Sequence, residues 1–317
     1  MQNFANVSQR GASSRFGVEK MPLSDIIIIM QIENLPKNKF PELLKQIPDP
    51  PKSLRIVGEL PAENNPDIKY LCVVGSRRYS QYGKEVCESL IDGLRGYPIA
   101  IVSGLALGID GIAHRAALNA GLKTVSIPGS GLCEKNIYPS AHKELAKEIV
   151  ESGGCLLSEF VDTWHPRLES FPQRNRIMAG MSHATFVVEA ELKSGTLITS
   201  KYAIEYNRDV FTVPHSIFSK TSEGPHMLLR LGATPITQSS DIVTALGLRP
   251  KEELFETRDY SECSTDEKEV IEILREPMSR DEIIRMLEKP VYVTQTILAT
   301  MEIKGLIVEQ MGEIHLV

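Results

Sequence analysis

The sequence predicts an α/β protein with a doubly wound parallel sheet, followed by a smaller winged-helix-like domain. Two observations lead to this prediction. Between residues 70 and 213, six short apolar runs are interleaved with helical stretches, a pattern typical of parallel strands buried on both faces. From residue 264 onward, two amphipathic helices and a third helix precede a β-hairpin around Met311-Gly312, which is the element order of a winged-helix domain.

The six apolar runs also predict where a ligand would bind. Parallel strands joined by right-handed crossovers place their carboxyl ends at one edge of the sheet. Small residues or proline follow the runs, and open α/β sheets bind their ligands in the crevice at that edge. The runs are Leu71–Val74, Ile99–Val102, Thr124–Ile127, Cys155–Leu157, Ala184–Val188 and Val210–Val213.

Changes in composition divide the chain into five segments. The first is polar and is interpreted as a disordered lead-in, and the second as a short helical N-terminal segment that ends in the stiff linker Pro48-Asp49-Pro50-Pro51. A Rossmann-like core, a charged linker and the winged-helix-like domain follow. In order, the segments are residues 1–22, 23–52, 53–248, 249–263 and 264–317.

The C-terminal domain is acidic, whereas the core is close to neutral. Residues 266–317 hold 6 Lys and Arg against 11 Asp and Glu, and residues 69–215 hold 16 against 15. The third predicted helix, Val293–Lys304, carries only Lys304 as a cation, and a recognition helix for duplex DNA would present several. We therefore expect this domain to bind protein or to do little, rather than to bind a DNA groove, and any nucleic-acid site to be a local patch in the core.

Composition indicates a cytoplasmic protein without a membrane span or a metal site. The five cysteines form no C-x-x-C pair, which indicates free thiols in a reducing compartment. No apolar run reaches the length of a transmembrane helix. Metal-ligand clusters, H-E-x-x-H and a nucleophile elbow are also missing from the sequence.

Four loops that follow strands are suited to phosphate groups. Their small residues let backbone amides approach an anion, and two of the loops add a cation. None of them completes G-x-G-x-x-G or G-x-x-x-x-G-K-[ST], so we expect no NAD, FAD or other nucleotide cofactor. The loops are Gly75-Ser76-Arg77, Ser103-Gly104, Gly129-Ser130-Gly131 and Lys193-Ser194-Gly195-Thr196.

A basic helix start lies close to these loops in the predicted fold. Arg174 and Arg176 follow Phe171-Pro172, where Phe171 is expected in a loop with its ring available for stacking. Cations beside an aromatic face hold single strands without sequence preference. We expect Arg77 and Lys193 to hold phosphates together with the two arginines.

The candidate acid–base groups give no catalytic site. Asp110 and His114 could share a helix face, but a capping aspartate and a surface histidine explain that spacing better. Glu159 and Glu189 are the other two candidates, and Glu189 is expected to pair with an arginine. We therefore expect no catalytic residue.

The motifs together resemble the DNA-processing protein A family, DprA, also called Smf. They span about residues 50–245 in order. They are Val74-Gly75-Ser76-Arg77 with Tyr82-Gly83, Ser103-Gly104-x-Ala106-x-Gly108-Ile109-Asp110 with Ala113-His114, Gly129-x-Gly131 with Tyr138-Pro139, Ser158-Glu159, Phe171-Pro172-x-Arg174-Asn175-Arg176, Val188-Glu189-Ala190, and Lys193-Ser194-Gly195-Thr196-Leu197-Ile198-Thr199.

The resemblance implies an extended Rossmann-like core without established catalysis. It further implies single-stranded DNA binding, a homodimer, protection of incoming DNA and loading of the recombinase RecA during natural transformation, with single-strand-binding protein as a further partner. It places single-strand contacts at Gly75-Ser76-Arg77 and Lys193-Ser194-Gly195. Together with the other loops and the basic helix start, the expected DNA-binding residues are Gly75, Ser76, Arg77, Ser103, Gly104, Gly129, Gly131, Phe171, Arg174, Asn175, Arg176, Lys193, Ser194, Gly195 and Thr196.

Two alternatives stay open at this point. A Rossmann-like nucleotide phosphoribohydrolase would also place glycine loops and carboxylates at the sheet edge, but its P-G-G-x-G-T-x-x-E turn is not present. A protein scaffold with a vestigial pocket is the other alternative, and it would bind no oligonucleotide even at low salt.

Overall fold

The structure, a computed structural model, describes residues 31–249, 263–274, 278–287, 289–310 and 312–316. These residues belong to two compact units, one that ends at Arg249 and one formed by the residues after it. The predicted disordered lead-in, the first part of the N-terminal segment and nearly all of the predicted linker lie outside the described residues.

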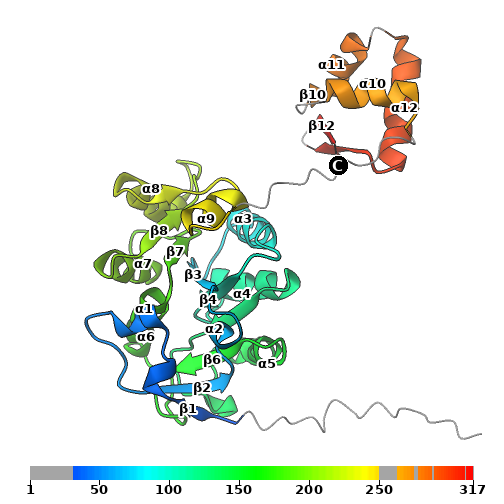
Figure 1. Ribbon diagram of the computed structural model, residues 1–317. Helices are drawn as coiled ribbons and strands as arrows, with labels where there is room; N and C mark the ends of the chain where they lie inside the picture. Colours follow the sequence, from blue (N-terminus) through cyan, green and yellow to red (C-terminus); the bar gives the residue numbers. More distant parts are fainter. Residues whose placement is uncertain (1–30, 250–262, 275–277, 288, 311, 317) are drawn as a thin grey trace, which may run out of the picture. The chain divides into compact units, whose positions relative to one another are not determined.

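The first unit is organised around a nine-stranded sheet of order β1-β2-β6-β5-β4-β3-β7-β8-β9 (Figure 1). Seven neighbouring strands in this order, β6-β5-β4-β3-β7-β8-β9, all pair in parallel, which confirms the doubly wound parallel sheet. Each predicted apolar run forms one strand, and these are β3 (Lys69–Val74), β4 (Ile99–Ser103), β5 (Lys123–Ser126), β6 (Cys155–Ser158), β7 (Ala184–Val187) and β8 (Asp209–Thr212), with β9 (Thr234–Pro235) at the edge.

The parallel strands lack alternation because both of their faces are covered. In β3, Leu71 and Val73 belong to one apolar cluster, and Cys72 and Val74 belong to another on the opposite face. The described helices lie on both sides of the sheet (Figure 1). They are α2 (Pro61–Asn64), α3 (Gln81–Asp92), α4 (Ile109–Asn119), α5 (Lys143–Glu151), α6 (Ser170–Met181), α7 (Thr196–Glu205), α8 (Glu223–Arg230) and α9 (Ser239–Ala245).

The N-terminal segment is less helical than its sequence suggests. Its described part begins with strand β1 (Glu33–Leu35), and only the short helices η1 (Lys37–Lys39) and α1 (Glu42–Lys45) follow. β1 pairs antiparallel with β2 (Leu54–Gly58), which pairs antiparallel with β6. The sheet is therefore mixed at this end, because β2 runs antiparallel to β6 and β1 runs antiparallel to β2.

Among its described residues, the second unit contains three helices and a three-stranded sheet of order β10-β12-β11. Both predicted capping boxes are formed, because Ser264 and Ser279 each exchange hydrogen bonds with the glutamate three residues later. The three helices and the final hairpin follow the predicted order, strand β10 was not predicted, and the winged-helix assignment stays a prediction. The elements are α10 (Thr265–Ile273), β10 (Met278–Ser279), α11 (Arg280–Met286), α12 (Val291–Ile303), β11 (Ile307–Gln310) and β12 (Glu313–Leu316).

Candidate functional site

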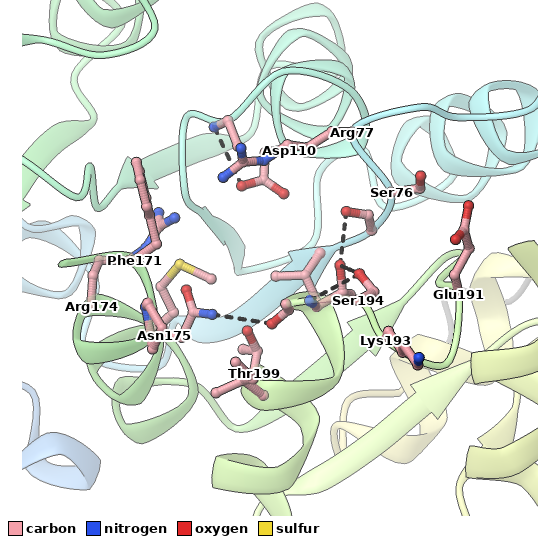
Figure 2. Close-up of a pocket in the computed structure, with 18 of the residues that line it drawn as sticks. Ser76, Arg77, Asp110, Phe171, Arg174, Asn175, Glu191, Lys193, Ser194 and Thr199 are labelled. Atoms are coloured by element: carbon pink, nitrogen blue, oxygen red, sulfur yellow. Dashed lines mark hydrogen bonds between the residues drawn. The ribbon is translucent and has the colours of Figure 1, made fainter. Parts of the chain in front are cut away.

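A pocket of about 360 Å³ opens at the carboxyl ends of β3 and β7 (Figure 2). The strand order reverses between these two neighbours, since β4, β5 and β6 lie on one side of β3 and β7 and β8 on the other. Such a switch point is where open α/β sheets bind ligands. The lining residues include Gly75–Arg78, Asp110, Phe171, Arg174, Asn175, Glu191 and Lys193–Thr196.

The loop after β3 forms one side of the pocket and is shaped by its own side chains. The Ser76 hydroxyl donates to the Arg78 carbonyl at 2.7 Å and accepts from the Arg78 amide at 3.1 Å. Gly75 lies so close to α4 that a Cβ would come within 2.6 Å of Ile109 Cγ1. The glycine thus allows close packing, and the serine holds the turn that presents Arg77.

The loop after β7 forms the facing side and is bonded to the first loop. The Ser194 hydroxyl accepts from the Thr196 amide at 3.1 Å and donates to Thr196 Oγ1 at 2.9 Å. Thr196 Oγ1 in turn donates to the Gly75 carbonyl at 3.0 Å. The two loops therefore form one unit, and the positive end of the α7 dipole lies at the pocket.

Three exposed cations line the pocket. Arg77 and Lys193 were predicted from the sequence, and they project from the two bonded loops (Figure 2). Arg78 is the third and was missed, although it directly follows the predicted Gly-Ser-Arg motif. The Arg77 guanidinium carbon lies 5.3 Å from the centroid of the Phe171 ring, so charge and an aromatic face occur together at this rim.

Phe171 is helical, and its expected place in a loop was wrong. It lies in the first turn of α6, which begins at Ser170. Pro172 had suggested a loop, but proline is well tolerated in the first turn of a helix. The Phe171 ring still lines the pocket, and its centroid lies 6.0 Å from that of the exposed Tyr138.

Arg174 forms part of the buried floor of the pocket. Its side chain is 4 % exposed and donates to the Ile127 carbonyl. Burial lowers the pKa of the Arg174 guanidinium, and the Asp110 carboxylate opposes that shift. Burial also raises the pKa of Asp110 against the charge of Arg174, while Asp110 accepts from the Gly104 and Ala106 amides at 3.2 and 3.4 Å.

Arg176 points away from the pocket. It pairs with the Glu159 carboxylate and donates to the Asp49 carbonyl at 2.7 Å, which fastens the N-terminal segment to α6. Burial raises the pKa of Glu159, although Arg176 favours its charged form. Asn175 does line the pocket, and its amide donates to the Gly195 carbonyl at 3.4 Å.

The other two predicted glycine loops have packing roles in this structure. None of their predicted residues lines the pocket. Ser103 Oγ donates to the Val73 carbonyl at 2.7 Å, and a Cβ on Gly104 would collide with the Arg174 guanidinium. Gly129 faces the Phe171 ring in the same way, and Gly131 faces the carbonyls of residues 161 and 162. DNA contact by these residues stays a prediction.

Two ionisable side chains are placed differently from expectation. His114 is fully buried rather than at the surface, and its Nδ1 lies 2.7 Å from Thr124 Oγ1. Glu189 is fully buried and bonds Ser80, at 2.9 Å from its amide and 2.8 Å from its hydroxyl, instead of an arginine. Ser80 Oγ then accepts from the Gly83 amide and caps α3.

Among the residues that the structure describes, no cluster of His, Cys, Asp and Glu could hold a metal ion. Within the same residues, no helix has both the length and the apolar character needed to cross a membrane.

Comparison with known proteins gives consistent relatives. The chain is 41 % identical over 207 residues to the Smf protein of Escherichia coli, which covers 65 % of this chain and 54 % of that protein. It is 40 % identical over 204 residues to DNA processing protein DprA of Streptococcus pneumoniae, covering 64 % and 70 %. The match thus spans about half the length of the Smf proteins of E. coli and Synechocystis.

Two solved structures share the fold. The S. pneumoniae DprA structure has a TM-score of 0.62 at 37 % identity and covers 68 % of this chain and 74 % of that one. DNA processing protein A of Helicobacter pylori, described for its single-stranded DNA binding mode, has a TM-score of 0.61 at 30 % identity, covering 68 % and 96 %. The family model for DNA recombination-mediator protein A matches residues 32–247, more than half of the sequence, and this chain belongs to that family.

Proposed function

We propose that the first unit binds single-stranded DNA at the pocket between β3 and β7, as a mediator of recombination rather than as an enzyme. The observation that carries the proposal is the pair of exposed cations, Arg77 and Lys193, on two loops that are bonded through Thr196 and Gly75. A strand that contacts both loops would have successive phosphates neutralised from two sides, with Phe171 available to a base.

The chemistry of the rim favours binding without sequence preference. The hydroxyls of Ser76, Ser194 and Thr196 are engaged in holding the loops. The rim therefore offers mainly positive charge, backbone and an aromatic face. Such groups position a phosphate backbone but do not distinguish one base from another.

Family membership supports a wider proposal. We infer that the protein acts in the cytoplasm as a homodimer, protects incoming DNA and loads RecA onto it during natural transformation. Single-strand-binding protein is proposed as a further partner. The single-stranded DNA binding described for the H. pylori relative supports the DNA-binding step of this proposal.

The salt dependence of oligo(dT) binding tests the proposed site. Three exposed cations at the rim predict a slope of about −2.1 for log affinity against log salt, at about 0.7 per phosphate contact on a single strand. Arg77→Ala combined with Lys193→Ala should flatten the slope by about 1.4 and weaken binding. Fluorescence anisotropy with labelled oligo(dT) between 50 and 300 mM salt, at roughly even steps, would measure both quantities.

A matched double variant controls for the loss of two charges. Lys147→Ala with Lys201→Ala removes the same charge from the half-buried Lys147 on α5 and the exposed Lys201 on α7, neither of which lines the pocket. This variant should keep the wild-type slope. If the rim variant and the control bind alike, the site assignment is wrong.

The pocket is also lined by two carboxyl groups, Asp110 and Glu191, and the phosphoribohydrolase alternative would need carboxylates at this edge of the sheet. Asp110 already accepts two backbone amides in the floor, and Glu191 is exposed on the rim. We therefore assign neither a catalytic role. Release of free base from nucleoside monophosphates, lost in Asp110→Asn, would contradict the proposal.

A further inference from the structure

The loop after β8 presents an unusually exposed aromatic ring at the edge that holds the pocket. Phe218 is 92 % exposed and its neighbour Ile217 is 79 % exposed. β8 lies directly beside β7 in the sheet, so its loop leaves the same carboxyl edge as the loop of Lys193. An exposed aromatic face beside a proposed single-strand site is suited to stacking on a base.

The loop that carries Phe218 is held in place by hydrogen bonds. His215 Nε2 donates to the Val188 carbonyl at 2.7 Å, and the Ala190 amide donates to the Thr221 carbonyl at 2.8 Å. Within the loop, the Phe218 amide donates to Ser216 Oγ at 3.3 Å. Both ends are thus fastened to the segment that follows β7, and the ring is held outward instead of packing into the core.

A contact also connects this loop to the other side of the pocket. The Tyr82 hydroxyl donates to the Pro214 carbonyl at 2.8 Å, and the Tyr82 ring packs edge-on against His215 at 4.9 Å between centroids. Tyr82 lies in the first turn of α3, shortly after Arg77 and Arg78. The Phe218 loop therefore contacts the segment after β7 and the first turn of α3, which follow the two loops that line the pocket.

The surroundings of Phe218 favour a nucleobase over a protein surface. The exposed apolar pair is flanked by the polar Ser216 and Ser219 and by the exposed cation Lys220. Single-strand sites combine aromatic faces with cations in this way, whereas the centre of a protein interface is depleted of charge. We propose that Phe218 stacks on a base of the DNA strand where it leaves the pocket over the Lys193 loop, an inference that rests on the proposed function.

Phe218→Ala tests this second contact separately from the phosphate contacts. Stacking on one base predicts a loss of affinity of roughly five- to a hundredfold for long oligo(dT). The salt slope should stay at the wild-type value, because no phosphate contact is lost. Phe218→Trp should retain affinity, and its emission should be quenched on binding relative to that of Trp164, the one tryptophan of the natural sequence.

Oligonucleotide length and a matched variant sharpen the test. With oligo(dT) shortened in single-nucleotide steps, the difference between wild type and Phe218→Ala should vanish once the strand no longer reaches the loop. Ile204→Ala removes another exposed apolar side chain, near the far end of α7 from the pocket, and should bind like wild type at every length.

The outcomes distinguish the inference from the function on which it rests. If Phe218→Ala binds long oligo(dT) like wild type while Arg77→Ala with Lys193→Ala does not, the stacking contact is refuted and the DNA site stands. If Phe218→Ala instead alters sedimentation of the protein alone, the ring belongs to a protein contact and the inference is overturned. Absence of any oligo(dT) binding by the wild type refutes both.

Discussion

Replacing Glu189 by glutamine should destabilise the first unit, because this buried carboxylate organises the loop of Arg77. Glu189 is 0 % exposed, and its two oxygens accept from the amide and the hydroxyl of Ser80. Ser80 ends the Arg77 loop and caps α3 through the Gly83 amide. The glutamine oxygen would still accept from the Ser80 amide, but its NH₂ group would face the Ser80 hydroxyl, whose own O–H bond to the carboxylate would be lost.

The contacts of Glu189 set the size of the effect. A hydrogen bond to a charged group contributes about 1.5–3 kcal/mol, and an N-cap contributes about 1 kcal/mol. Because one of the two bonds is lost and the cap is only loosened, we expect the free energy of unfolding to fall by roughly 2–3 kcal/mol. For a unit of this size, that loss lowers Tm by about 4–12 °C.

Tryptophan fluorescence can follow this unit alone, since the single tryptophan of the chain, Trp164, lies in it. Urea unfolding at pH 7.5 would give the change in unfolding free energy, and thermal unfolding the change in Tm. Glu191→Gln is the control, with the same substitution at an exposed carboxylate two residues later, and it should change stability by less than about 0.5 kcal/mol. Equal stability of the two variants would refute the role assigned to Glu189.

Two further predictions follow from the charges of the site and of the core. Glu191→Gln removes a negative charge from the pocket rim, so its affinity for oligo(dT) should rise by about two- to fivefold at low salt and return toward wild type as salt is added. Burial lowers the pKa of His114 to about 3, below the 6.5 of the unfolded chain, so the unfolded state binds the proton first. The free energy of unfolding should therefore be highest above pH 6.5 and should fall toward pH 3 by up to roughly 1.4 kcal/mol per pH unit. His114→Asn should make this pH dependence of the unfolding free energy less steep, as measured by urea titrations.

The orientation of the His114 ring supports the sign of its pH effect. Thr124 Oγ1 donates to the Ile101 carbonyl at 3.0 Å, so it accepts from His114 Nδ1–H. The unprotonated Nε2 is buried and has no partner among the described residues. Protonation would thus place a second N–H in the core without an acceptor, which the folded state resists.

The parallel sheet was predictable because both of its faces are covered. Burial on both sides removes polar residues from the strands and leaves runs that no other element of this length explains. The loops after β3 and β7 could be paired for the same reason, since parallel strands end at one edge. In contrast, β1 is three residues long and pairs with β2 across a connection of 18 residues (36–53), so local periodicity carries no signal for it.

The two arginines of α6 show which site details the sequence left unresolved. Residues two apart in a helix point about 200° apart around its axis, so Arg174 and Arg176 could not both face one pocket once the segment was helical. The helix start at Ser170 was the missing information, and Pro172 obscured it. Arg78 was overlooked because the motif ended at Arg77, although a loop that turns at Ser76 exposes both side chains.

The charges of this site serve two separate purposes, and burial separates them. Arg174, Arg176 and Glu189 are buried, and each bonds a partner inside the protein. Removing either partner of such a contact leaves a polar or charged group in the core without a hydrogen bond. Arg77 and Lys193 are exposed on the rim, where charge contributes little to folding but much to the attraction of an anion. Substitutions of Arg77 and Lys193 should therefore change the salt slope of DNA binding without changing the free energy of unfolding. Substitutions of the three buried residues should lower the free energy of unfolding, and they should weaken binding only because the loops become less ordered. If a substitution of Arg174, Arg176 or Glu189 changed the salt slope of oligo(dT) binding while the free energy of unfolding stayed the same, the buried floor itself would contact phosphate.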